Sequence, residues 1–222
     1  MIRFQGKYLR TLVQFQAQSD IRYHLNGILV EPHPQGGVML VATNGHMLAA
    51  IRDTQGTCSE RTVFNPDKGA ISAAIKRNKL GTPWVDVNPY TNRLSVRARS
   101  AMRAGGMQEV EIYAQGGSAV IEGASQYFPE WRNIIPDFST LKPGAADVLQ
   151  GNYLRRIIDA HPGNINGSRP VKLWQAEKNG VVIVQFDGSP ETMAVIMPMR
   201  DELPEISACF GSGFLQPMKA AA

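Results

Sequence analysis

The 222-residue chain has little cysteine and lacks any long apolar run. Cys58 and Cys209 form no C-x-x-C motif and the four histidines are scattered, so neither a disulfide framework nor a zinc site is indicated. No apolar run approaches the length of a membrane span, and the start MIRFQGKYLR lacks the apolar core of a signal peptide. We therefore expect a cytoplasmic protein with no membrane partner, metal or cofactor.

The sequence also lacks common catalytic motifs. It contains no P-loop, no G-x-S-x-G and no H-E-x-x-H. Asp86 and Asp187 could be read as metal ligands, but each is expected at a strand end beside turn residues, where an aspartate usually forms the turn. The sequence predicts that the protein is not an enzyme.

What is present is a mildly basic, globular composition. The net charge is +4, the isoelectric point is about 9.2, and 43% of the residues are hydrophobic. This chain can bury one sizeable core or two smaller ones. The basic excess permits a polyanionic partner without proving one.

A hairpin is the strongest local signal. Two apolar runs, 38–43 and 46–51, are separated by Asn44 and Gly45 alone, which predicts a tight hairpin with a type I′ turn. Such a hairpin is usually only structural, and a lone histidine such as His46 is more often a hydrogen-bonded group than a catalyst. The alternative is a small apolar dimple that grips a peptide.

The pattern along the chain predicts three copies of one unit: a strand, a helix and a short antiparallel meander. Amphipathic helices are expected at 7–18, 67–79 and 152–160, the second capped by Asp67, with Ile71, Ala74 and Ile75 facing inward. The first strand of each copy is expected at 2–5, 61–65 and 147–150. The remaining strands are expected at 23–31, 38–43, 46–51, 84–90, 93–99, 109–115, 119–122, 171–177, 181–186 and 192–197.

Four segments, in order, resemble the bacterial sliding clamp, the beta subunit of DNA polymerase III. DIRYHLNGIL (20–29) and ATNGHMLA (42–49) resemble runs of its second domain, FPEWRNIIP (128–136) resembles the join to its third domain, and IMPMR (196–200) resembles the end of clamp chains. The resemblance implies an α+β, DNA-clamp (processivity) fold of strand-helix-strands repeats, with the helices on one face of antiparallel sheets.

The resemblance also suggests how the chain is divided. Residues 1–127 are expected to form a complete clamp-like domain of two repeats, 128–146 a connector, 147–200 a single repeat resembling part of the third domain, and 201–222 a tail. The tail is either frayed or packed on a neighbouring surface, and the loop at 100–106 extends beyond the family pattern. Family rings contain twelve repeats, so three per chain favour a tetramer, with a dimer or a trimer left open.

Clamp partners insert a short peptide, with a glutamine and bulky apolar residues, between the second and third domains. On the matching positions the pocket is expected to comprise Leu25, Thr43, Gly45, His46, Met47, Leu48, Pro136, Val195, Met197, Pro198, Met199 and Arg200. Met47 stands where the family usually has arginine, and Asp201 follows Arg200 where clamps usually end in an apolar residue. These two departures leave open whether the pocket prefers the same partner peptides as the host clamp.

Basic residues recur on the exposed faces of the three predicted helices. For any one helix the simpler interpretation is a solvated face, but three such faces side by side would form a strip that attracts phosphates without reading bases. The candidate DNA-binding residues are Lys7, Arg10, Lys68, Lys76, Arg77, Lys79, Arg155 and Arg156.

Two functions remain open. The first is a sliding clamp, or processivity factor, that encircles duplex DNA as a homo-oligomeric ring and tethers a DNA polymerase or other clamp-motif proteins, with a clamp loader as a further candidate partner. The second is a non-encircling decoy or adaptor that binds the clamp-motif peptides of host replication proteins.

Overall fold

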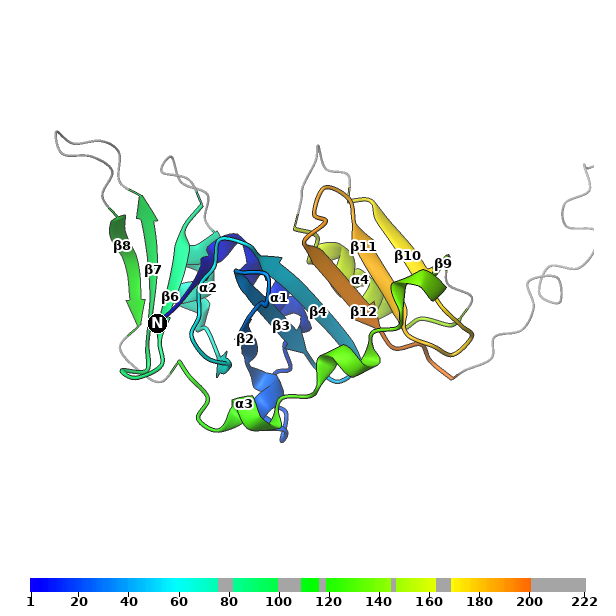
Figure 1. The fold of residues 1–222 in the computed structure, drawn as a ribbon, viewed down its shortest axis with the longest axis horizontal. Coiled ribbons are helices and arrows are strands. Elements are labelled where there is room, and N and C mark those ends of the chain that lie inside the picture. The colour runs from blue at the N-terminus through cyan, green and yellow to red at the C-terminus, as the bar shows by residue number, and fades with distance from the viewer. Residues whose placement is uncertain (76–81, 100–108, 116–118, 145–146, 163–168, 201–222) are drawn as a thin grey trace, which may run out of the picture.

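The computed structural model describes residues 1–75, 82–99, 109–115, 119–144, 147–162 and 169–200, and for 99 and 109–115 only the backbone. The predicted loop at 100–106 and the tail at 201–222 lie outside these residues. Three units follow one another along the chain (Figure 1). The first comprises β1 (Ile2–Gln5), a 3-10 turn (Gly6–Tyr8), α1 (Leu9–Phe15), β2 (Ile28–Pro32), β3 (Val38–Thr43) and β4 (Met47–Asp53).

The second unit and the connector complete the first two thirds of the chain. The second unit comprises β5 (Thr62–Phe64), α2 (Lys68–Ile75), β6 (Trp84–Asn88), β7 (Arg93–Arg99) and β8 (Glu109–Gln115). α3 (Ala124–Tyr127) follows, and the connector then contains two 3-10 turns (Trp131–Ile134 and Phe138–Thr140).

The third unit repeats the same order of elements. It comprises β9 (Lys142–Pro143), α4 (Gly151–Asp159), β10 (Val171–Gln175), β11 (Val182–Phe186) and β12 (Thr192–Ile196).

The strands form two antiparallel sheets, and the first two units exchange their first strands. The four-stranded sheet has the order β1-β6-β7-β8, and the eight-stranded sheet has the order β5-β2-β3-β4-β12-β11-β10-β9. Thus β1 completes the sheet of the second unit and β5 completes the sheet of the first. The third unit instead places β9 beside its own β10, and β12 joins β4 to make one continuous sheet.

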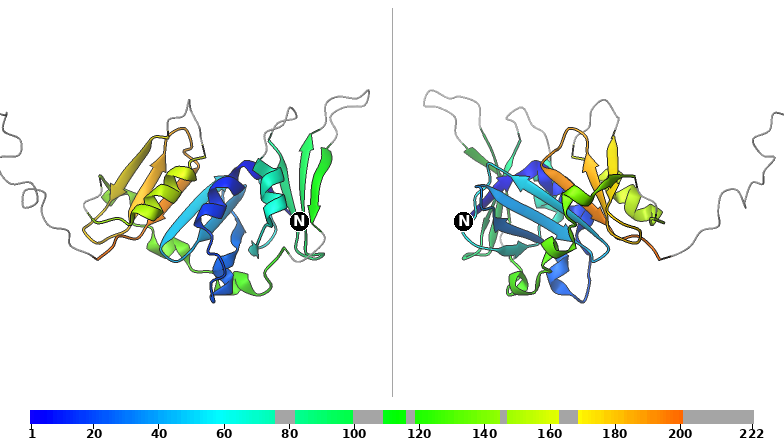
Figure 2. Two further views of the ribbon diagram at one scale, coloured as in Figure 1. Left: turned by 180° about the vertical axis from the view of Figure 1, so that it is seen from behind. Right: turned by 45° about the vertical axis from the view of Figure 1, so that its right-hand side comes forward.

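The helices lie on one side of the sheets and the connector lies on the other. Seen from behind, α4, α1 and α2 form a row (Figure 2, left), and α1 contacts both of the other helices. The main core fills the helix side, and a smaller cluster around Leu29, Leu48 and Trp131 lies under the connector. The buried hydroxyl of Thr11 donates to the Ala160 carbonyl at 2.6 Å, which ties α1 to the end of α4.

Several predicted elements end at different residues. Residues 23–26 form a 3-10 turn rather than part of a strand. The Asn26 side-chain carboxamide accepts from the Asp20 backbone amide and donates to the Asp20 carbonyl, which folds the segment back on itself. The first helix ends at Phe15, with Ser19 at a positive φ of 56° shortly after. Residues 119–122 make only an isolated bridge, between Phe64 and Val120.

Two further predictions about the second and third units are wrong. The first strand of the third unit is the pair Lys142–Pro143, not 147–150, because those two residues pair with the edge of β10. Ile75 is 40% exposed rather than inward, although the predicted cap is confirmed: the Asp67 carboxylate accepts from the Ala70 amide at 2.7 Å.

Asp86 does not lie at a strand end. It lies within β6, buried, and pairs with Arg3 and Arg97 at 3.3 and 3.2 Å. Its negative charge therefore partly balances the positive charges of these two arginines on the four-stranded sheet.

Candidate peptide pocket and basic helix face

The pairing of β4 with β12 brings the hairpin tip next to the end of the third unit. Leu48 pairs with Val195, and Met47 pairs with Ile196. Immediately beyond, the Met197 amide donates to the His46 carbonyl at 2.9 Å. Segments about 150 residues apart in sequence thus share one rim.

The hairpin turn is not the predicted two-residue type I′ turn. The last pair between β3 and β4 is Thr43 with Leu48, so four residues, 44–47, lie between the paired positions. Asn44 does not adopt the positive φ that a type I′ turn needs. The Asn44 carboxamide oxygen accepts from the amides of His46 and Met47 at 3.0 Å, and this local bonding holds the wider turn. Gly45 has a φ of +88°, a conformation that favours glycine.

A small depression lies beside this turn. It is lined by Thr43, Gly45, His46, Met47, Leu48, Ile134, Val195 and Met197. Its cavity volume is only about 20 Å³, room for roughly one water molecule. Leu48 and Val195 are almost fully buried and form its floor, whereas His46 is exposed and Met197 is half-buried. In this conformation the depression is closed to an apolar side chain.

Other predicted pocket residues lie elsewhere. Leu25 is buried, and Pro136 lines a neighbouring hollow with Ile135 and Val181. Met47 borders the depression, but it is 2% exposed and belongs to the helix-side core. Because β-strand side chains alternate, Met47 points away from the face on which Leu48 lies.

The last predicted pocket residues follow β12. Pro198 is half-buried, and Met199 and Arg200 are exposed. None of the three lines the depression among the described residues. The Met199 amide donates to the Val148 carbonyl at 2.8 Å, which fixes this segment against the residues that precede α4.

Three residues at this rim were missed by the sequence reasoning. The rings of His46 and Tyr153 stack with centroids 5.8 Å apart. The Arg22 guanidinium lies over Gly45, about 3.1 Å from where a β-carbon would be. It pairs with Asp20 at 2.8 Å, and this hydrogen bond lowers the pKa of the Asp20 carboxyl to about 2. The third residue, Ile134, lies within the FPEWRNIIP segment, and the resemblance of that segment to the clamp family could have indicated it.

The connector is anchored by a buried carboxylate. Glu31 on β2 accepts from the Trp131 indole at 3.2 Å and pairs with Arg132 at 2.6 Å and with Arg61 at 3.6 Å. Because Glu31 is buried, these partners are needed to offset its desolvation. They position Ile134 at the rim of the depression.

The described DNA-binding candidates lie on α1, α2 and α4 or on the 3-10 turn that leads into α1. Lys7, Arg10, Lys68 and Arg155 are exposed and Arg156 is half-buried, whereas Lys76, Arg77 and Lys79 lie outside the described residues. Arg155 lies 3.8 Å from Asp159, which also pairs with Arg169, so part of its charge is offset. The structure brings the helices themselves into one row (Figure 2).

Comparison with solved structures identifies this architecture. The chain matches the DNA polymerase sliding clamp of Pseudomonas aeruginosa, solved with a ligand, at a TM-score of 0.60 and 16% identity, covering 90% of this chain and 66% of that one. It matches the DNA polymerase III beta subunit of Thermotoga maritima at a TM-score of 0.58 and 10% identity, covering 91% and 66%. The chain has the sliding-clamp fold.

The other two comparisons found no match. No protein-family model and no curated protein sequence matches the chain. It spans about two thirds of the length of the clamps it resembles. A putative DNA polymerase III beta subunit from Eubacterium rectale matches over 95% of this chain, at a TM-score of 0.56 and 13% identity.

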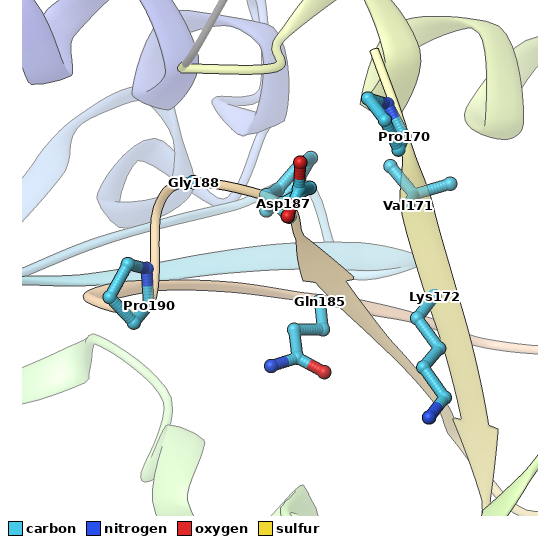
Figure 3. Close-up of a pocket in the computed structure, with 8 residues that line it drawn as sticks. Pro170, Val171, Lys172, Gln185, Asp187, Gly188 and Pro190 are labelled. Carbon is cyan, nitrogen blue, oxygen red and sulfur yellow. The ribbon is translucent and has the colours of Figure 1, made fainter.

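Another hollow in the described part of the chain lies away from the predicted pocket residues. A hollow of about 360 Å³ lies where β10 begins and at the turn between β11 and β12 (Figure 3), and no predicted pocket residue lines it. Within the described residues, no His, Cys, Asp and Glu side chains form a group of three or more that could hold a metal. No helix in the described part of the chain is long and apolar enough to cross a membrane.

Proposed function

We propose that the chain is a sliding-clamp subunit. Its helix face contacts the phosphates of duplex DNA without sequence preference, and its outer rim holds a peptide of a DNA polymerase or another clamp-motif protein. The observation that carries the proposal is the β4–β12 junction, because it joins the hairpin and the 195–197 segment on a sheet with the clamp fold.

The depression opens on the outer face by movement of its flexible wall. Its floor, Leu48 and Val195, belongs to paired strands and stays fixed. Met197 has an unbranched side chain that changes rotamer at little cost, and it is the wall most able to move. His46 remains stacked on Tyr153 and offers an aromatic face and a ring nitrogen to a partner.

The helix face supplies charge rather than base recognition. Arg10 and Arg155 occupy matching positions of the segments QGKYLR and QGNYLR, and both are exposed. Each phosphate contact that is removed is expected to lower the slope of log affinity against log salt by about 0.9. Exchanging both arginines for glutamine should therefore lower the slope by about 2, whereas Arg93→Gln on the opposite face of the four-stranded sheet should not.

The peptide site is tested by His46→Ala. The backbone bond from Met197 to His46 does not need the imidazole, and the lost ring stack costs about 0.5–1.5 kcal/mol of fold stability at most. We expect at least about tenfold weaker binding of a labelled clamp-motif peptide, measured by fluorescence anisotropy. His33→Ala, in the turn between β2 and β3, is the matched control. Equal affinity for both variants would remove the peptide site from this rim.

An adaptor that binds partner peptides without enclosing DNA is the second candidate. It is favoured by the third unit, which stands alone, whereas the first two units form a pair. Peptide binding with no salt-dependent affinity for duplex DNA would select it over the clamp subunit.

A further inference from the structure

The first and third units carry the same local sequence at their helices. QGKYLR (5–10) leads into α1, and QGNYLR (150–155) leads into α4. The same spacing in sequence relates Ala49 to Ala194, and these two residues face each other at the centre of the β4–β12 pairing. The two units are therefore related by a local twofold axis through that junction.

In the first unit, one stripe of this helical segment is covered by the second unit. Gly6, Leu9 and Val13 share a face at helical spacing, and Gly6 and Leu9 are buried. A β-carbon on Gly6 would lie 2.8 Å from the Ala74 carbonyl oxygen of α2 and 3.0 Å from the Ala74 β-carbon. Glycine is needed there because α2 approaches so closely.

In the third unit, the matching stripe is open. Gly151, Leu154 and Ile158 occupy the equivalent positions of α4. A β-carbon on Gly151 would meet no atom of the described residues within 4 Å, and Gly151 is exposed. Leu154 is half-buried and Ile158 is 43% exposed, so an apolar stripe with a glycine gap remains uncovered.

The sheet beneath this stripe shows the same difference. Ile28 of β2 is fully buried in the first unit, where β5 of the second unit pairs with it. Its counterpart on β10, Leu173, is only partly buried, because the two-residue strand β9 pairs only with Trp174 and Gln175. The third unit therefore lacks the cover that the second unit gives to the first.

We propose that the α4 stripe of Gly151, Leu154 and Ile158 binds the same stripe of a second copy of this chain across a twofold axis. A second copy fits because the chain already shows what covers this face: another unit of the same kind, packed helix to helix. The pair would place α2, α1 and α4 of one copy in line with α4, α1 and α2 of the other. The proposal does not rest on the proposed function, since peptide binding and DNA contact by single chains would survive its failure.

The test is the mass of the full chain by light scattering over a concentration series. We expect a dimer of the 24.3 kDa chain, and at least about tenfold weaker dimerisation for Gly151→Ala, because the added methyl overpacks a close helix contact. Gly151→Ala has open space in the single chain and favours its helix, so misfolding does not explain the loss. Circular dichroism at low concentration checks this.

A matched pair of surface variants locates the interface. Ile158→Glu should give a monomer, whereas Ile75→Glu, at similar exposure on α2, should remain a dimer. A wild-type chain that stays monomeric at about 100 µM, where an interface of standard size is saturated, would overturn the proposal. So would a dimer that tolerates both Gly151→Ala and Ile158→Glu, because its interface would lie elsewhere.

Discussion

The two glycines of the repeated segment should respond in opposite ways to the same substitution. Alanine at Gly6 places its methyl 2.8 Å from a backbone oxygen and 3.0 Å from two further atoms of α2 and the residue before β6. Carbon atoms essentially never approach so closely, so α2 must shift, and overpacking of this kind costs about 1–3 kcal/mol. Alanine at Gly151 meets nothing and gains up to about 1 kcal/mol of helix propensity.

The assay is chemical denaturation of both variants at the lowest workable protein concentration, where self-association contributes least. The two free energies of unfolding should differ by about 1–4 kcal/mol, which for a chain of this length is a gap of about 2–16 °C in melting temperature. Values that agree within about 0.5 kcal/mol would refute the reasoning, because the two segments would then be equally packed.

Two further predictions test the packing. Thr11→Val removes the buried hydroxyl that donates to the Ala160 carbonyl at 2.6 Å, so unfolding free energy should fall by about 1–3 kcal/mol in urea denaturation, and no change would argue that α4 is not held on α1 in solution. Burial raises the pKa of the Cys58 thiol to about 11, so in a Cys209→Ser background its alkylation at pH 8 should be much slower than that of a free thiol and should accelerate as the pH rises toward 11; an ordinary rate at pH 8 would contradict its burial.

Elements with strong alternation and clear ends could be predicted from sequence. The strands 93–99 and 109–115 have the predicted bounds, and α4 differs from its prediction by a single residue at each end. The order of strand, helix and meander in each unit followed from periodicity, and the α+β clamp fold followed from the quoted segments. These features depend on local pattern, which a single sequence carries.

Features set by particular hydrogen bonds, distant or local, were not predicted. The pair Lys142–Pro143 has no strand pattern, and it is a strand only because β10 offers it an edge. Likewise, the Asn44-Gly45 pair signals a two-residue turn, but the side chains of Thr43 and Asn44 bond the turn amides and widen it. Local propensity yielded in both places to hydrogen bonds that the pattern does not encode.

The candidate site divides in the same way. The hairpin and the 195–197 segment were expected together, and the β4–β12 pairing places them together. The stacking of Tyr153 on His46 and the position of Arg22 over Gly45 depend on how distant segments pack together. No single segment of the sequence predicts them. The peptide-binding and DNA-binding roles of these residues stay predictions.

Enclosure of DNA is the central claim, and topology tests it most directly. Labelled protein is assembled on a nicked circular plasmid, with a clamp loader if one is required, washed at a salt concentration that removes simple electrostatic binding, and followed before and after the plasmid is cut once. A clamp should remain on the circle and be lost when the cut supplies free ends. Equal retention on circular and linear DNA, or none on either, would contradict the account.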